Sequence, residues 1–206
     1  MAVLRSHTFM EIFGRINMTY YAKIGSPIGE LLIVSNGISI TRICMDNQKY
    51  GADIEEDWIE RSNLEPISLA REQLNAYFAG HLKKFDLPLT MIGTPFQKRV
   101  WAELIKIPFG EIISYGELAR RIDNPNASRA VGLANGKNPM AIVVPCHRVI
   151  GSNGSLTGYG GGLPNKQYLL EMERTLEQGN VNSASNFEGD LWTWSEQNEL
   201  PLKNGS

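Results

Sequence analysis

The sequence predicts an α/β protein of the α+β kind, in which a small amino-terminal domain combines an antiparallel hairpin sheet with a helix. A mainly helical domain follows, with a helix-turn-helix and a short strand that leads into a cysteine. Two strand-like runs meeting at an Asn-Gly turn, a helical apolar pattern after them, and two helix-start signals in the second half support this prediction. We assign residues 1–17 to an extension, 18–92 to the first domain, 93–176 to the second, and 177–206 to a polar, acidic tail.

Composition is that of an ordinary globular protein and excludes several kinds of site. Hydrophobic residues make up 42% of the chain, and no apolar run reaches the ~18 to 20 residues that a membrane-spanning helix needs. Because Arg5, Glu11 and Arg15 interrupt any signal-peptide core, we expect a cytoplasmic protein. With only 2 cysteines, far apart in sequence, we expect no disulfide, no metal site and no cofactor.

The net charge of −2 hides a basic middle segment. Residues 95–174 carry 10 Lys and Arg against 6 Asp and Glu, whereas the segments before and after them are acidic. A local positive excess suits a phosphate-binding face, although ordinary solvated surface charge explains the count equally well. Charge alone therefore does not decide whether the partner is a nucleic acid.

The elements of the first domain follow from its turn and its periodicity. Residues 30–35 and 38–45 are strand-like, and Asn36-Gly37 between them readily takes the positive φ of a tight turn. We therefore predict a hairpin, with Cys44 as a small core residue of its second strand. Residues 68–78 place apolar side chains on one helical face, which predicts a helix.

Two capping-box sequences open the second domain, Thr94 with Gln97 and Ser114 with Glu117. In this motif a hydroxyl side chain accepts from the backbone three residues later, and Gln or Glu reaches back. The elements expected here are helices over 96–107, 115–122, 126–135 and 163–176, a buried strand over 139–145, and a glycine-rich loop over 151–162.

The helix expected over 126–135 carries mostly small side chains, with Arg129 as the one long exception. Together with the helix before it, it matches a helix-turn-helix, whose thin second helix can approach DNA closely. A plain helical hairpin fits the same pattern and stays an alternative.

Cys146 follows the predicted strand and a proline, so its backbone is held at an element end where a side chain can face a cleft. The imidazole of His147 can favour the thiolate, which is the nucleophile in alkyl or acyl transfer. The alternative is a buried structural thiol, which is the commoner state of a lone cysteine.

The residues around Cys146 resemble a known family. The word PCHRVI at 145–150, preceded by GKNP at 136–139, is similar to the active-site signature of the methylated-DNA–protein-cysteine methyltransferases. The resemblance runs from about residue 93 to 174 and, more weakly, through 20–34, where the chain is similar to bacterial members. It implies DNA repair by single-turnover transfer of a methyl or other alkyl group from O6 of guanine to Cys146, with O4 of thymine as a second candidate position.

The resemblance also implies roles for individual side chains. Cys146 accepts the alkyl group, His147 takes the thiol proton through a water, and Glu173 orients His147. Tyr115 donates its hydroxyl to the leaving guanine, which otherwise departs with negative charge. Arg129 occupies the gap in the base stack after the damaged nucleotide is flipped out of the duplex.

The same resemblance implies that seven further residues bind substrate or DNA, by bracing the active-site turn, lining the base pocket or letting the recognition helix lie in the minor groove. They are Asn138, Val149, Tyr159, Gly160, Ala127, Ala130 and Ala134. Gly160 stands where some relatives carry a serine, which leaves its backbone N–H for the contact with O6. The implied partner is double-stranded DNA containing O6-alkylguanine, bound by a monomer.

Two other functions stay open at this point. A non-catalytic sensor, like the alkyltransferase-like relatives that flip the base without repairing it, would bind alkylated DNA while Cys146 stays inert. A cysteine hydrolase built on Cys146 and His147 would release more product than there is enzyme.

Overall fold

The computed structural model describes residues 18–46 and 48–179, which belong to two compact units. The first unit comprises the described residues up to Ile92 together with Pro139–Val143, and the second comprises Gly93–Asn138 and the described residues from Val144 onward. The expected extension 1–17 and all but the first residues of the expected tail 177–206 lie outside the described residues. Among the described helices, none is long and apolar enough to cross a membrane.

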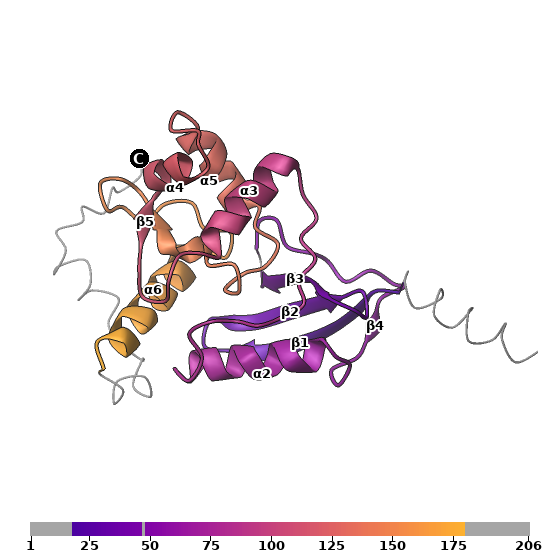
Figure 1. Cartoon of the computed structure of the whole chain (residues 1–206). Helices are drawn as coiled ribbons and strands as arrows, with labels where there is room; N and C mark the ends of the chain where they lie inside the picture. Colours follow the sequence, from indigo (N-terminus) through magenta and orange to yellow (C-terminus); the bar gives the residue numbers. More distant parts are fainter. Residues whose placement is uncertain (1–17, 47, 180–206) are drawn as a thin grey trace, which may run out of the picture. The chain divides into compact units, whose positions relative to one another are not determined.

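The first unit is a four-stranded sheet with a helix along it (Figure 1). The strands β1 (Tyr20–Ser26), β2 (Gly29–Ser35), β3 (Ile40–Met45) and β4 (Ile59–Glu60) lie in the order β3-β2-β1-β4. β2 pairs antiparallel with both of its neighbours, and the short β4 pairs parallel with β1. The buried face of α2 (Ile67–Phe78) packs on β1 and β2.

The predicted hairpin at Asn36-Gly37 is confirmed, with a loop longer than a two-residue turn. Asn36 Oδ1 accepts the backbone N–H groups of Ile38 and Ser39, and Gly37 has a φ of 87°, which favours glycine. Because these bonds shape a four-residue loop, β3 begins at Ile40 rather than at residue 38.

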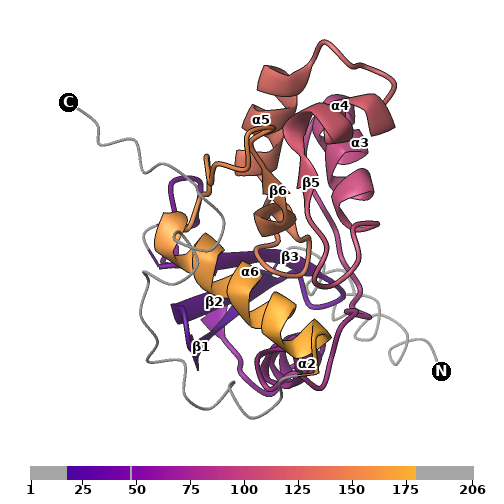
Figure 2. The same ribbon diagram turned by 90° about the vertical axis from the view of Figure 1, so that its left-hand side faces the viewer.

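The second unit holds the other helices of the described residues (Figure 2). Its elements are α3 (Pro95–Leu104), β5 (Ile113–Ser114), α4 (Tyr115–Arg121), α5 (Ser128–Gly136), the 3-10 turn η1 (Cys146–Arg148), β6 (Val149–Ile150) and α6 (Leu163–Glu177). β5 and β6 pair in parallel, and α5 packs against both α3 and α4. The buried Trp101 joins two of these helices, because its indole Nε1 on α3 donates to Ala134 O on α5 at 2.9 Å. The mixed α/β class predicted from the sequence is confirmed.

The two predicted capping boxes differ in completeness. At Thr94 both bonds form, since the hydroxyl accepts from Gln97 N at 3.2 Å and Gln97 Oε1 accepts from Thr94 N at 2.8 Å. At Ser114 only the hydroxyl bond forms, from Glu117 N at 3.0 Å. The Glu117 carboxylate is instead paired with two arginines one turn later. The predicted helix start at Ser114 is therefore confirmed, whereas the predicted bond from the Glu117 side chain back to the backbone of Ser114 does not form.

The strand predicted over residues 139–145 is wrong. Ile142 has a φ of 70°, which no continuous strand contains, and the backbone around it forms turns. One isolated bridge joins Met140 to Ile43, with hydrogen bonds of 2.9 Å from Ile43 N to Pro139 O and from Ala141 N to Ile43 O. The apolar run is buried as its composition suggests, and it adds to the edge of β3 in the first unit as a short irregular strap.

Candidate active site

Cys146 lies on a turn that two asparagine side chains brace. It is the first residue of η1, and 7% of it is exposed. Asn138 Nδ2 donates to Val144 O at 2.7 Å, and Asn135 Nδ2 donates to Cys146 O at 3.3 Å. Asn138 was predicted from the sequence as a site residue, whereas Asn135, which the structure places at the same turn, was not.

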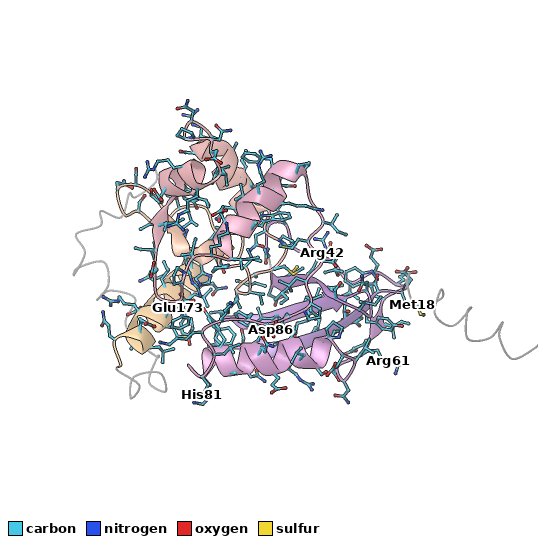
Figure 3. The ribbon with its side chains drawn as sticks, viewed as in Figure 1. Met18, Arg42, Arg61, His81, Asp86 and Glu173 are labelled. Carbon is cyan, nitrogen blue, oxygen red and sulfur yellow. The ribbon has the colours of Figure 1, made fainter. Side chains whose placement is uncertain are left out.

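His147 and Glu173 form a buried pair. His147 Nε2 lies 2.9 Å from Glu173 Oε1, both residues are 0% exposed, and Glu173 projects from α6 (Figure 3). Burial lowers the pKa of His147, although the Glu173 carboxylate acts in the opposite direction, so the ring is neutral at pH 7. With Nε2–H donating to the carboxylate, Nδ1 is the basic nitrogen, and it has no hydrogen-bond partner among the described residues.

Arg148 completes this cluster, although the sequence did not single it out. Its Nε and Nη2 donate to the two oxygens of Glu173, each at 2.8 Å, and its Nη1 donates to Ile107 O at 2.6 Å. Burial would raise the pKa of Glu173, but His147 and Arg148 outweigh it and hold the pKa well below its usual range. Glu173 is therefore ionised and fixed in place. Arg148 stands inside the PCHRVI word, which was the available signal.

Lys166 is another residue that the sequence did not reveal. It is fully buried on α6, and its Nζ donates to Val149 O at 2.6 Å and to Thr157 O at 2.9 Å. Burial lowers the pKa of Lys166 to about 8, while Cys146 acts to raise it. The sequence did carry a signal for a buried lysine, because Lys166 stands three residues before the inward-facing Leu169 and so lies on the apolar stripe of the predicted helix.

The thiol of Cys146 is protonated at rest. Burial raises its pKa, and a hydrogen bond with Asn138 and the positive charge of Lys166 oppose that rise. The predicted stabilisation of a resting thiolate by the neighbouring imidazole does not apply, because His147 is neutral and bound to Glu173. The thiolate forms only when a base removes the proton.

Tyr115 is the first residue of α4, and its hydroxyl donates to Thr157 O at 3.0 Å. Burial, followed by Cys146, raises the pKa of Tyr115 to about 12, while hydrogen bonds with Thr157 and Asn135 lower it. Tyr115 therefore stays protonated at neutral pH and can act as a donor.

The other predicted pocket residues lie on β6 and on the loop that follows it. The side chain of Val149 is fully buried, whereas Tyr159 and Gly160 are half-buried in the glycine-rich loop. The Tyr159 hydroxyl is buried without a hydrogen-bond partner among the described residues, and burial raises its pKa well above the usual value. This hydroxyl is therefore a protonated donor.

The residues of α5 that were predicted to contact DNA do not all lie on the exposed face of the helix. Arg129 and Ala130 are exposed, and Ala127 is half-buried at the start of the helix. The structure corrects the prediction that Ala134 contacts DNA. This residue is 3% exposed and packs inward, and its carbonyl accepts a hydrogen bond from the indole of Trp101. The exposed face continues instead through Leu133, which is 64% exposed.

Together these groups can carry out nucleophilic transfer. A buried thiol, a neutral imidazole oriented by an ionised carboxylate, and a protonated phenol can remove a proton, attack an electrophilic carbon and protonate a leaving group. Within residues 18–46 and 48–179, no group of three or more His, Cys, Asp or Glu side chains is arranged to hold a metal ion.

Comparison with known proteins matches both units. The family model described as 6-O-methylguanine DNA methyltransferase, DNA binding domain, covers residues 95–175, and the model described as its ribonuclease-like domain covers 19–91. The methylated-DNA–protein-cysteine methyltransferase of Mycobacterium bovis is 51% identical over 158 residues, which are 77% of this chain and 94% of the relative. That of Methanosarcina acetivorans is 51% identical over 154 residues, 75% of this chain and 97% of the relative. A solved structure of Mycobacterium tuberculosis OGT in complex with DNA has a TM-score of 0.71 at 50% identity, over 76% of this chain and 94% of that one.

Proposed function

The chain belongs to the methylated-DNA–protein-cysteine methyltransferase family, and from that premise we propose that it repairs DNA by moving an alkyl group from O6 of guanine onto Cys146. O4 of thymine is a second candidate donor position. The observation that carries the proposal is the braced, buried Cys146 next to an imidazole whose Nε2 is bound to Glu173 and whose Nδ1 is open to a proton.

In the proposed reaction a water passes the Cys146 proton to His147 Nδ1, and Glu173 stabilises the imidazolium. Sulfur then bonds to the alkyl carbon as the bond from that carbon to O6 breaks, and the electron pair goes to the guanine. The Tyr115 hydroxyl donates its proton to the departing base. Because the product is a thioether, which is a very poor leaving group, each molecule acts once.

Access to O6 requires the damaged nucleotide to leave the base stack. We propose that α5 lies in the minor groove of a duplex bound by one protein molecule, with Arg129 in the gap that the flipped nucleotide leaves. The exposure of Arg129, Ala130 and Leu133 on one face supports this placement. Contacts with phosphates release counterions, so we expect affinity to fall as salt rises.

Peptide masses test the chemistry directly. After incubation with a duplex containing O6-methylguanine, we expect one methyl group on the peptide that holds Cys146 and never more than one per protein molecule. If that peptide gains no methyl group, the proposal fails. Binding of the modified duplex without a mass change would favour the sensor, and more product than protein would favour a hydrolase.

An Arg129→Ala variant is expected to transfer methyl groups from duplex DNA about tenfold more slowly or worse, because unstacking costs a few kcal/mol and about 1.4 kcal/mol is tenfold. Transfer from a single-stranded oligonucleotide should change little, since no stack has to be opened. Arg61→Ala, in the first unit, is the matched control. Full recovery of the duplex rate in Arg129→Lys would instead show that Arg129 acts as a phosphate contact.

A further inference from the structure

We propose that Arg148 is a positioning residue for the transfer reaction, because its guanidinium binds the Glu173 carboxylate and so keeps the His147 imidazole unprotonated until the Cys146 proton arrives. The inference rests on the proposed function and deepens it. It divides two tasks within the buried cluster. Glu173 orients the imidazole, and Arg148 prevents the carboxylate from drawing a proton onto the ring before the reaction begins.

The first support is the geometry of the buried cluster. Arg148 Nε donates to Glu173 Oε2 and Arg148 Nη2 donates to Glu173 Oε1, each at 2.8 Å, so the guanidinium binds both carboxylate oxygens. His147 Nε2 lies 2.9 Å from the same Oε1. His147 and Glu173 are 0% exposed and Arg148 is 5% exposed, so water screens these charges poorly. Both charges therefore act strongly on the imidazole.

The backbone that follows α3 holds the two charged groups against each other. Arg148 Nη1 donates to Ile107 O at 2.6 Å, and the N–H of Gly110 donates to Glu173 Oε2 at 3.1 Å. Gly110 has a φ of 75°, which favours glycine, and the guanidinium carbon lies 5.7 Å from the centre of the Phe109 ring. One short turn thus anchors both the guanidinium and the carboxylate.

The second support is the balance of charge around His147. A buried carboxylate without a counter-charge is strongly unfavourable, and an imidazole bound to it can supply that charge by taking up a proton. Here the guanidinium already neutralises Glu173, so a proton on the ring would leave excess positive charge in a buried site. During transfer the thiolate of Cys146 supplies the balancing negative charge. Protonation of His147 is therefore coupled to formation of the nucleophile.

Other titratable groups face this cluster from α6, from η1 and from the glycine-rich loop, and they are Lys166, Cys146 and Tyr159. The thiol and the phenol are protonated at rest and carry no charge, because burial raises the pKa of each. Burial lowers the pKa of His147, Glu173 raises it, and the positive charges of Arg148 and Lys166 lower it. The carboxylate is thus the group that draws a proton toward the ring, and the guanidinium is the cation bound to it.

Titration of His147 tests the inference without relying on transfer activity. The chain contains 3 histidines, and a His147→Gln variant identifies the ring resonance of His147 in nuclear magnetic resonance spectra. We expect the midpoint of the His147 titration to lie at higher pH in Arg148→Met than in the unaltered protein, because methionine removes the guanidinium charge. Arg61→Met, at an exposed position of the first unit, is the matched control and should leave the midpoint unchanged.

The pH profile of methyl transfer gives a second readout. Single-turnover rates are measured between about pH 5.5 and about pH 7, below the pKa of Lys166, which is about 8, so that its charge stays nearly constant. We expect Arg148→Met to slow transfer about tenfold more at the acidic end than at the neutral end, since one pKa unit changes the population of free base tenfold. Arg148→Lys keeps the charge without the two-pronged contact, so its profile should keep the unaltered shape at a lower rate.

An unchanged His147 midpoint in Arg148→Met would overturn the inference. Equal slowing of transfer at every pH would overturn it as well, because a merely structural role has that effect. If Arg148→Met does not fold, the titration compares Glu173→Gln with the double variant that also carries Arg148→Met and buries neither charge, and the midpoint must again rise when the guanidinium is removed. Absence of transfer by the unaltered chain would overturn the proposed function together with this inference, whereas transfer with an unchanged midpoint overturns the inference alone.

Discussion

A Glu173→Gln variant is expected to lose both stability and most of its transfer activity. Among the described residues, Glu173 supplies the only negative charge to which the buried guanidinium of Arg148 is hydrogen-bonded, and the substitution removes it. Breaking a buried pair in this way costs about 3 to 5 kcal/mol of unfolding free energy. Transfer should slow on the order of 10²-fold, since an amide stabilises the imidazolium of His147 poorly. Denaturant unfolding and single-turnover rates measure the two effects.

The pH dependence of stability provides a second measurement on the same pair. The pKa of Glu173 is lowered on folding, so its contribution is fully present above the unfolded value of about 4.3 and is lost as pH falls toward the folded value. The unaltered chain should therefore lose this stability below about pH 4.3, and Glu173→Gln should not. Glu111→Gln, at an exposed position of the same unit, is the control and should leave the pH dependence of stability and the transfer rate unchanged. If Glu173→Gln is as stable as the control variant, the buried pair contributes no net stability.

A Cys146→Ala variant is expected to bind alkylated duplex with nearly unchanged affinity and to transfer no methyl group at all. Affinity is supplied by the surface that meets the duplex, whereas the bond to carbon needs the sulfur. A DNA-binding assay and peptide masses on the same sample measure both properties.

The other cysteine supplies the control. Cys44 is buried in β3, where burial raises its pKa, and Cys44→Ala should retain transfer to Cys146. Methyl transfer by the Cys146→Ala protein, to Cys44 or to any other residue, would show that the acceptor is assigned wrongly.

Local signals in the sequence were enough to predict most elements of the fold. The box at Thr94 and the turn at Asn36-Gly37 each depend on residues within a few positions of one another, and both form as expected. The run at 139–145 failed because a short apolar stretch shows that a segment is buried without showing its backbone conformation. The left-handed φ of Ile142 follows from tertiary packing, which no local pattern encodes.

The residues of the site likewise fall into two groups, those that a sequence pattern marked and those that only the tertiary structure shows. Cys146, His147 and Glu173 were singled out through their resemblance to a family, and the structure brings His147 and Glu173 into contact across 26 positions of sequence. Asn135 and Lys166 were missed because they act on backbone carbonyls, which every residue possesses and no motif marks. Ala134 was misplaced because the order of small residues along a helix does not by itself show which face is buried.

The strap Pro139–Val143 has a consequence for any dissection of the protein. A fragment that begins at Gly93 would carry these residues without the strand β3 beside which they lie, and would expose apolar side chains that are buried in the whole chain. A fragment that stops at Ile92 would keep the bridge from Ile40 to Leu89 but would leave the edge of β3 unpaired at Ile43, where it could pair with other molecules. We therefore expect both fragments to aggregate, so that expression boundaries, tags and fusion partners belong outside residues 18–179.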